Sequence, residues 1–243
     1  MNLCQYEGFF KYNIRMTQNI PIHIAIIPDG NRRWAKKKGF PSFEGHRVGA
    51  EKTLPSLIEK ADELGIKFLT FWALSPQNLQ REKKEVDNLF RLLRLFLQKR
   101  IGEFHKKNIR LRVIGDMFHL PTDLQTEIKK AEKLTEKNSK ITVLFAINYG
   151  GKNEIIRAIG KIPQSAISNI QEAGIGKFLD TSGIPDPDLI IRTGGEKRLS
   201  GFMLWQSEYS ELYFSDILFP DFTPLELEKA ILDYSCRERR FGK

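Results

Sequence analysis

Short apolar runs alternate with amphipathic stretches along most of the chain. Five runs have the length and the β-branched content of buried strands, at residues 23–27, 66–73, 109–114, 141–147 and 188–192. Two shorter candidates for strands lie at 202–205 and 211–214. Because strands alternate with helical patterns, the sequence predicts an α/β fold, in which a central, mostly parallel sheet carries helices on both faces.

The amphipathic stretches predict helices with recognisable ends. One helix should follow the turn at 28–31, and others are predicted at 48–64, 83–107, 124–137, 154–159 and 224–234. Gly65 suits the residue after the end of the helix at 48–64, and Pro55 predicts a kink inside it. Residues 39–47 are expected to form a loop, and residues 161–183 a short helix with surface loops.

The chain shows no internal repeat and no change of composition that would mark a linker. We therefore expect one domain at 21–243, preceded by a flexible N-terminal extension at 1–20. Residues 1–18 lack the continuous apolar core of a signal peptide, and Met16 is an alternative start of translation. The two cysteines, Cys4 and Cys236, lie far apart, which is typical of a protein from a reducing compartment. The sequence thus predicts a cytoplasmic protein.

The composition is that of a soluble globular protein. Of 243 residues, 41% are hydrophobic and 28% are charged, and no apolar run approaches the length that spans a bilayer. The formal net charge of +9 favours anionic partners, namely phosphates, nucleic acid or an acidic membrane surface. Charge alone does not choose between these partners and a basic surface that binds nothing.

Candidate chemistry is concentrated in the turn after the first predicted strand. This strand ends at Pro28-Asp29-Gly30-Asn31, and a basic helix follows directly. The free backbone N–H groups and the positive dipole end of a helix N-terminus form an anion site. Asp29 adds a carboxylate there, which is most easily explained by a divalent cation held between it and a phosphate. The turn therefore predicts a metal-assisted phosphate or diphosphate site.

Two further polar loops are predicted to follow strands, at residues 74–81 and 192–201. The carboxyl ends of parallel strands lie at one edge of a sheet, so these loops and the Asp29 turn should converge. Arg192, Arg198 and Ser200 offer several donors in a glycine-rich loop, which suits a diphosphate. The sequence contains no P-loop, no dinucleotide-binding fingerprint and no nucleophile elbow. Among the histidines, His46 is the best candidate to contact a phosphate, and His23 is predicted to be structural.

Seven motifs, in order from about residue 22 to residue 242, resemble those of the cis-prenyltransferases. They are DGNRRWA at 29–35, GH at 45–46, NYGG at 148–151, DLIIRTGGE at 188–196, LWQ at 204–206, ELYF at 211–214 and RERRFG at 237–242. The resemblance implies a parallel sheet with a hydrophobic tunnel, and an enzyme that condenses isopentenyl diphosphate onto an allylic diphosphate such as farnesyl diphosphate. It also implies Mg²⁺, a homodimer, peripheral membrane contact at most, and a medium or long cis-polyprenyl diphosphate of the undecaprenyl carrier type.

The resemblance also assigns roles to single positions. Asp29 corresponds to the acid that handles Mg²⁺ and the departing diphosphate, and Glu211 to a second acidic position linked to the metal. The positions around the allylic diphosphate are Gly30, Asn31, Arg32, Arg33, Trp34 and His46. The positions that hold isopentenyl diphosphate are Arg192, Arg198, Leu199 and Ser200.

The loop at 74–81 corresponds to the region of proton removal, with Asn78 as its central residue and Ser75, Pro76 and Arg81 nearby. An amide is a poor base, so the released diphosphate is an alternative proton acceptor. Tunnel walls are expected from Phe71, Ala73, Leu89, Phe90, Leu93, Phe96, Ile141 and Phe145.

Four positions depart from the family pattern. Pro28, Ser42, Gln77 and Leu79 replace a methionine, an arginine, a glutamate and a tryptophan. We expect the last three to line the substrate pocket, where they bear on the choice of allylic substrate. Two other readings stay open: a non-catalytic subunit that serves a catalytic partner, which the altered loop favours, and a basic nucleic-acid binder. Against the nucleic-acid binder, the arginines lie beside glycines at strand ends, without interleaved aromatics.

Overall fold

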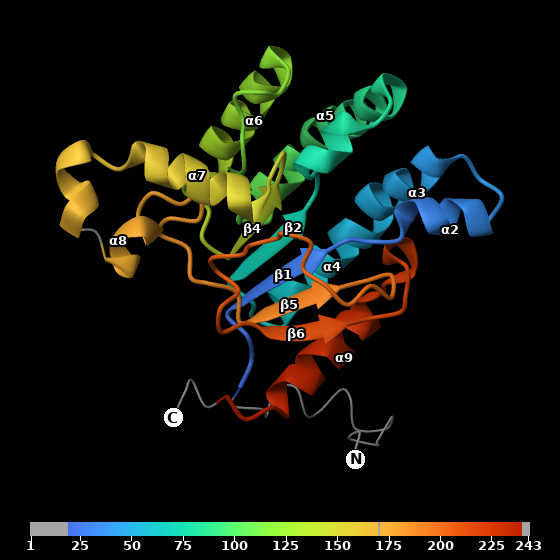
Figure 1. Ribbon diagram of the computed structural model, residues 1–243. Helices are drawn as coiled ribbons and strands as arrows, with labels where there is room; N and C mark the ends of the chain where they lie inside the picture. Colours follow the sequence, from blue (N-terminus) through green and yellow to red (C-terminus); the bar gives the residue numbers. More distant parts are fainter. Residues whose placement is uncertain (1–18, 170, 240–243) are drawn as a thin grey trace.

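The computed structural model describes residues 19–169 and 171–239, and it forms an α/β fold around one six-stranded sheet (Figure 1). The strands are β1 (His23–Ile27), β2 (Phe68–Trp72), β3 (Ile109–Ile114), β4 (Ile141–Ala146), β5 (Leu189–Arg192) and β6 (Glu211–Phe214). Their order is β3-β4-β2-β1-β5-β6, and every neighbouring pair is parallel. The predicted parallel α/β sheet is confirmed. The expected extension at 1–20 lies outside the described residues, apart from positions 19 and 20.

The helices cover the two faces of the sheet unequally. They are α2 (Asn31–Lys37), α3 (Ser42–Val48), α4 (Leu54–Glu63), α5 (Lys83–Lys106), α6 (Thr122–Thr135), α7 (Gly151–Lys161), α8 (Glu172–Gly176) and α9 (Pro224–Ser235). Helices α4, α5, α6 and α9 share one core with the sheet residues Ile24 and Phe71. The opposite face is packed by Tyr149, Phe202 and Met203, which come from irregular segments. These segments bring the second layer close to the ends of β1 and β5.

The segment between α2 and α4 differs from the prediction. Residues 42–48 form helix α3 instead of a loop, and a π-helical turn at Gly49–Thr53 joins it to α4. A Cβ on Gly45 would lie 1.9 Å from the Asn31 carbonyl oxygen, so the absent side chain lets α3 lie directly against α2. Near Pro55, where a kink is predicted, the chain stays helical: the π-helical turn ends at Thr53, and the proline lies in the first turn of α4.

The strand predicted at 202–205 is wrong. Residues 201–209 form consecutive turns, and Ser200, Gly201 and Met203 have positive φ angles of 53°, 90° and 46°. A left-handed backbone cannot continue a strand. The apolar character comes from packing instead, because Phe202 is fully buried and stacks on Trp72 with ring centroids 5.0 Å apart.

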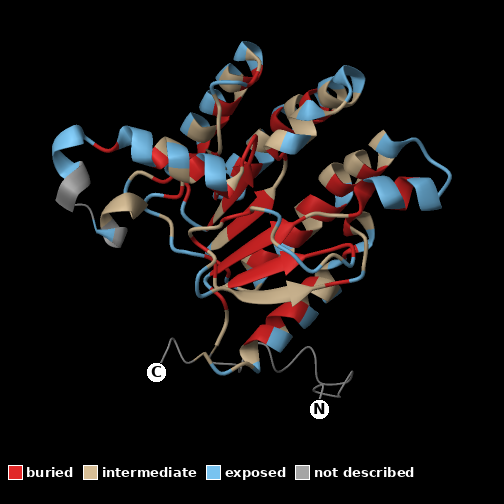
Figure 2. Cartoon of the chain, viewed as in Figure 1, coloured by how far each residue is buried: buried red, intermediate tan, exposed pale blue. Residues whose placement is uncertain are grey.

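The parallel strands place their carboxyl ends at one edge of the sheet. All strands point the same way, and the arrowheads of β5 and β6 in Figure 1 point toward α2 and α3. Figure 2 shows β1 and β5 buried and β6, the edge strand, only half-buried. Because the strands are parallel, the loops after β1, β2 and β5 share one side of the molecule.

Among the described residues, no helix is both long and apolar enough to cross a membrane.

Candidate active site

A cavity of about 1070 Å³ opens where the loops after β1, β2 and β5 meet. Its predicted lining residues are Asp29, Gly30, Asn31, Arg32, Arg33, Ser42, His46, Ser75, Gln77, Asn78, Arg81, Arg192 and Ser200. Its other lining residues are Ile27, Pro28, Lys36, Phe40, Pro41, Trp72 and Ala73. The three loops expected to converge therefore do so.

Asp29 lies between two arginines at the floor of this site. One carboxylate oxygen accepts a hydrogen bond from Arg33 at 3.1 Å, and the other accepts one from Arg192 at 2.9 Å. Its backbone is held by Thr193, whose hydroxyl oxygen lies 2.9 Å from the Asp29 nitrogen and 2.8 Å from the Asp29 carbonyl oxygen. A Cβ on Gly194 would meet the Arg33 guanidinium at 2.7 Å, so only glycine permits this approach. The carboxylate is thus fixed and charge-compensated.

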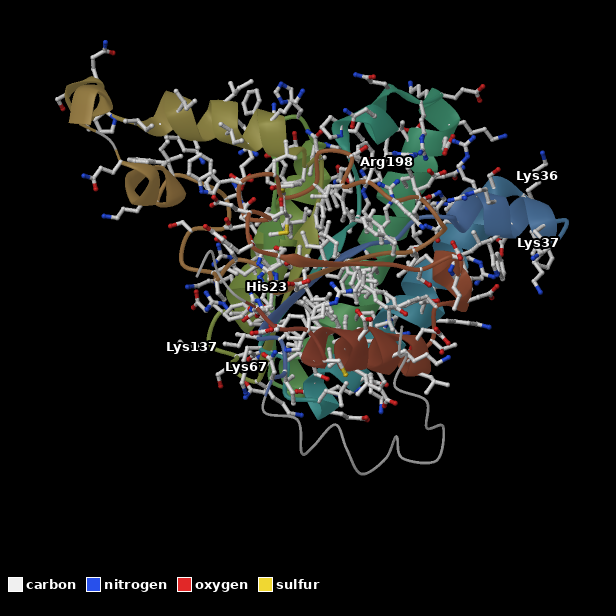
Figure 3. All side chains as sticks on the ribbon, turned by 60° about the horizontal axis from the view of Figure 1, so that its bottom comes forward. His23, Lys36, Lys37, Lys67, Lys137 and Arg198 are labelled. Atoms are coloured by element: carbon white, nitrogen blue, oxygen red, sulfur yellow. The ribbon has the colours of Figure 1, made fainter. Side chains whose placement is uncertain are left out.

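Arg192 is the centre of a second group of polar residues at the cavity, the second cradle, which also contains Ser200 and the Arg198 carbonyl. Its side chain is only 7% exposed, and one terminal nitrogen donates to the Ser200 hydroxyl at 2.8 Å and to the Arg198 carbonyl at 2.5 Å. Its Nε is buried and has no partner within the described part of the chain. Arg198 (labelled in Figure 3) pairs with Glu196, and its side chain is largely exposed, whereas its backbone carbonyl contacts Arg192. A buried cation with spare donor capacity is suited to an anionic ligand.

Asn78 presents a donor to the cavity. It lies in a 3₁₀ helix at Pro76–Gln80, where its Oδ1 accepts the Ser75 backbone N–H at 3.0 Å. The Asn78 N–H in turn reaches the Ser75 hydroxyl at 3.3 Å. Because a backbone N–H can only donate, the oxygen of the amide is identified and its NH₂ group is left to face a ligand. The hydrogen bond therefore leaves the donor end of the Asn78 side chain, and not its oxygen, available in the cavity.

His46 lies on α3 instead of in the expected loop, and it borders the cavity. Burial, assisted by the charge of Arg81, lowers the pKa of His46 to about 4, so its imidazole is neutral at pH 7. Its Nε2 and the Oδ1 of Asn31 are buried polar atoms without partners in the described residues. Buried polar groups are normally satisfied, and unpaired ones at a cavity wall mark a place for a ligand.

A smaller, apolar cavity of about 100 Å³ adjoins the main one and shares Pro28, Asn31, His46 and Ala73 with it. Its apolar walls include the predicted residues Phe71, Leu89, Leu93, Phe96 and Phe145. Gly49 and Ala50 of the π-helical turn and Phe219 also line it, and no periodic pattern predicts them. Ile141 and Phe90, both expected as walls, are buried without lining it.

Glu211 does not join Asp29 within one chain. It begins β6, pairs with Leu189 and lies level with Ile24, whereas Asp29 follows the end of β1. At about 3.3 Å per residue, the backbone level of Glu211 lies about 10 Å before the end of β1, and Asp29 lies beyond that end. The Glu211 carboxylate accepts from Arg237 at 2.7 Å. Within the described ranges, no group of three acidic, histidine or cysteine side chains could hold a metal ion.

Other predicted contact residues lie outside the cavity lining. Trp34 is buried beside Phe40, and Leu79 packs against the larger core. Leu199 packs against the second core, and Pro76 borders Gly150. Conversely, Lys36 and Phe40 line the cavity and were not predicted. Lys36 could have been found, because it lies one helix turn after Arg32 and so shares its face.

Comparison with known proteins identifies the class. The model of a family described as putative undecaprenyl diphosphate synthase matches residues 27–242. Isoprenyl transferases from Chlamydia trachomatis and Fusobacterium nucleatum are 45% and 47% identical to this chain, covering 95% and 93% of it and 95% and 98% of their own lengths. The class is thus a prenyl-transferring enzyme.

Solved structures agree with this class. Lavandulyl diphosphate synthase from Lavandula x intermedia, in complex with dimethylallyl diphosphate, matches with a TM-score of 0.88 and 42% identity over 92% of this chain and 99% of its own. A probable undecaprenyl diphosphate synthase from Campylobacter jejuni matches with a TM-score of 0.78 and 36% identity, over 93% of this chain and 100% of its own. The chain belongs to the undecaprenyl diphosphate synthase family, the cis-prenyltransferases.

Proposed function

We propose that this protein condenses isopentenyl diphosphate onto an allylic diphosphate, such as farnesyl diphosphate, to make a medium or long cis-polyprenyl diphosphate of the undecaprenyl carrier type. The observation that carries this proposal is the position of Asp29 between two sets of anion-binding residues. Arg32, Asn31 and His46 lie on one set of elements, and Arg192 and Ser200 on another. Two diphosphates can therefore be held in one cavity.

The arrangement supports a division of labour between the two substrates. The allylic diphosphate would lie against α2 and α3, with its hydrocarbon directed into the adjoining apolar cavity past Ala73. Isopentenyl diphosphate would lie on Arg192 and Ser200. The allylic carbon–oxygen bond breaks, a carbon–carbon bond forms to isopentenyl diphosphate, and a proton leaves. Arginines fixed beforehand stabilise the charge that develops on the departing diphosphate.

The residues fit Mg²⁺ together with substrate. Mg²⁺ in proteins is commonly held by one or two carboxylates together with substrate phosphates and water. Asp29, whose side chain is 29% exposed, is the carboxylate available for this in the cavity. When bound, Mg²⁺ supplies charge neutralisation to the leaving group. Asn78 donates through its NH₂ group and orients a diphosphate oxygen, which accepts the proton.

The apolar lining of the smaller cavity, although not its volume, supports a hydrocarbon product. A volume of about 100 Å³ holds about three waters' worth of space, so a long product requires its walls to move apart. The half-buried edge strand β6 is compatible with the proposed homodimer. The two widely spaced cysteines support a cytoplasmic enzyme, which would touch membrane only at product release.

An incorporation assay tests the proposal. The purified protein is incubated with Mg²⁺, labelled isopentenyl diphosphate and either farnesyl or dimethylallyl diphosphate, and products are resolved by length. The second primer is included because the structurally similar lavandulyl diphosphate synthase was solved in complex with it. We expect a series of longer products with farnesyl diphosphate and none after chelation of the metal. No incorporation with either primer would contradict the proposal and support the non-catalytic subunit.

A further inference from the structure

The turn at 200–207 has no regular structure, yet it determines where the second cradle lies. Phe202 and Met203 are fully buried, and Ser200 has a left-handed backbone. Ser200 receives a hydrogen bond from Arg192 at 2.8 Å, so a shift of this turn would move a ligand of Arg192. Turn backbones with positive φ are not self-stabilising for residues with side chains. Something outside the turn must therefore hold it.

The motif at 148–151 supplies the first contact with the turn. The Gly151 N–H, at the start of α7, donates to the Gly201 carbonyl at 2.7 Å. A Cβ on Gly151 would lie 2.8 Å from Leu204 and 2.9 Å from that carbonyl, so the turn is pressed against the helix start. Tyr149 also packs against Phe202, with ring centroids 6.0 Å apart. These contacts give the NYGG motif at 148–151 a structural role, although none of its residues lines the main cavity.

The second contact is a buried network centred on Glu154, which is 1% exposed. Its Oε2 accepts from the Tyr149 hydroxyl at 2.5 Å and from the Gln206 side-chain amide at 3.0 Å, and its Oε1 accepts from the Asp180 backbone N–H at 3.0 Å. The same Gln206 nitrogen donates to Thr181 at 2.9 Å. Three donors converge on two oxygens, an arrangement that a carboxylate satisfies completely.

We propose that Glu154 and Gln206 are positioning residues, which fix the turn at 200–207 on α7 and thereby hold Ser200 and the Arg198 carbonyl in place around Arg192. This inference rests on the proposed function and deepens it, because it assigns the network to the isopentenyl diphosphate side of the cavity. The residues proposed for the allylic diphosphate belong to α2 and α3 and take no part in the contacts described for the network. Loss of the network should therefore affect the two substrates unequally.

The direction of the hydrogen bonds between positions 154 and 206 can be reversed by substitution, which tests the proposal. In Glu154→Gln, the new NH₂ group replaces one carboxylate oxygen. It faces either the Asp180 N–H, or the Tyr149 hydroxyl together with the Gln206 amide. In the double variant Glu154→Gln with Gln206→Glu, the pattern is reversed. The amide oxygen introduced at position 154 accepts from the Asp180 N–H, and one hydrogen of the amide NH₂ group is donated to the carboxylate at position 206, which also accepts from Thr181. The other NH₂ hydrogen faces the Tyr149 hydroxyl, whose oxygen becomes an acceptor. The volume is unchanged, so only the direction of the hydrogen bonds differs.

The experiment compares the wild-type protein, the Glu154→Gln variant and the double variant. We expect Glu154→Gln to raise KM for isopentenyl diphosphate at least about fivefold, with KM for the allylic diphosphate changed less than about twofold. Amide hydrogen exchange should become faster at 196–207, and the double variant should restore both measurements. Equal KM values for isopentenyl diphosphate in wild type and Glu154→Gln, or equal increases for both substrates, would overturn the proposal.

A matched control separates positioning from general destabilisation. Thr135 is fully buried, accepts from the Leu111 N–H at 3.0 Å and belongs to α6. Thr135→Val should lower Tm as the network variants do, and leave both KM values unchanged. If it shifted KM for isopentenyl diphosphate to the same extent, the network would have only a structural role. If Glu154→Gln does not fold, Tyr149→Phe removes one donor and keeps the ring, and it must still raise KM for isopentenyl diphosphate.

The test remains informative if the proposed function fails. Inorganic diphosphate is titrated calorimetrically into each variant, and hydrogen exchange is measured without substrates. A wild-type protein that incorporates no isopentenyl diphosphate refutes the proposed function. Weaker binding of diphosphate with faster exchange at 196–207 in Glu154→Gln still supports the positioning role. Unchanged binding and exchange refute that role, whatever the activity.

Discussion

The two edges of the sheet carry similar chemistry with different outcomes. At the carboxyl edge, Asp29 pairs with Arg192 beside a large cavity. At the amino edge, Asp188 pairs with Arg239 at 2.8 Å and also accepts the backbone N–H groups of Ile22 and His23. Figure 3 labels one residue beside each pair: His23, whose N–H donates to Asp188, and Arg198, whose carbonyl accepts from Arg192. An arginine–carboxylate pair therefore does not by itself identify a site.

The difference lies in the cavity beside the Asp29 pair and in the polar atoms of its lining residues. At the amino edge the Asp188 carboxylate receives donors from three residues and fastens β1 to the C-terminal segment. At the carboxyl edge Arg192, His46 and Asn31 line the cavity, and each has one buried polar atom (Nε, Nε2 and Oδ1) without a partner among the described residues. Unpaired buried polar atoms cost free energy unless a ligand satisfies them. The carboxyl edge is thus organised for binding and the amino edge for stability.

The largest expected effect is that of Asp29→Ala. The change removes the carboxylate proposed to handle Mg²⁺ and the leaving group, and we expect kcat to fall by about 10²-fold to 10³-fold. The protein should still fold, with a lower Tm, because Arg192, whose side chain is only 7% exposed, loses the carboxylate that compensates its charge. Steady-state kinetics and thermal unfolding of the same preparation check this. Full activity would remove Asp29 from the mechanism.

The second largest effect distinguishes Arg192 from Arg198 at the carboxyl edge. Arg192→Ala removes a buried guanidinium and should raise KM for isopentenyl diphosphate by about 10-fold to 100-fold, the value of a few charge-assisted hydrogen bonds. Arg198→Ala should raise it less, because the Arg198 side chain is 60% exposed and its carbonyl, which the change keeps, contacts Arg192. Equal effects would show that the Arg198 guanidinium turns inward when substrate binds.

The amino edge should respond in the opposite way. Asp188→Ala leaves the Ile22 and His23 N–H groups without their acceptor and removes one of several acceptors of Arg239, so the free energy of unfolding should fall by about 2–3 kcal/mol. The kcat of the folded enzyme should stay within about twofold of wild type. Denaturant unfolding and kinetics at a temperature well below Tm separate the two quantities. A tenfold loss of kcat without loss of stability would contradict the comparison.

The smallest effect is a pH dependence of stability that arises from His23. Burial lowers its pKa to about 4, while its ring contacts the Pro185 carbonyl at 2.6 Å and the Thr70 hydroxyl at 2.7 Å. The neutral ring is the folded form, so this stabilisation is complete above the unfolded-state pKa of 6.5 and is lost as the pH falls toward 4. Between about pH 7.5 and 5 the loss amounts to about 2 kcal/mol.

His23→Gln isolates this contribution from that of His46, whose pKa is lowered in the same direction. We expect the free energy of unfolding of the variant to decrease by about 2 kcal/mol less than that of wild type over the same pH range. Parallel pH profiles for the two proteins would show that His23 is protonated in the folded state.

Much of the fold could be predicted because it depends on local pattern. The strand at Ile109–Ile114 and the helix at Lys83–Lys106 match their predicted positions to within one residue, since apolar spacing alone distinguishes them. The strand predicted at 202–205 is absent, because an apolar run of this length does not distinguish a strand from a turn that distant contacts bury. Phe202 and Met203 are apolar because they pack on Trp72 and Tyr149, and their backbone follows that packing.

The sequence by itself determined the parallel α/β architecture and the meeting of three polar loops at one edge. Both follow from periodicity and from the shared direction of parallel strands. Only the tertiary structure decided which charges are available there: Arg192 is turned into the cavity, Arg198 projects outward, and Glu211 lies at the far edge. Side-chain direction and strand register depend on contacts between distant segments, and those contacts are not encoded in the spacing of residues along the chain.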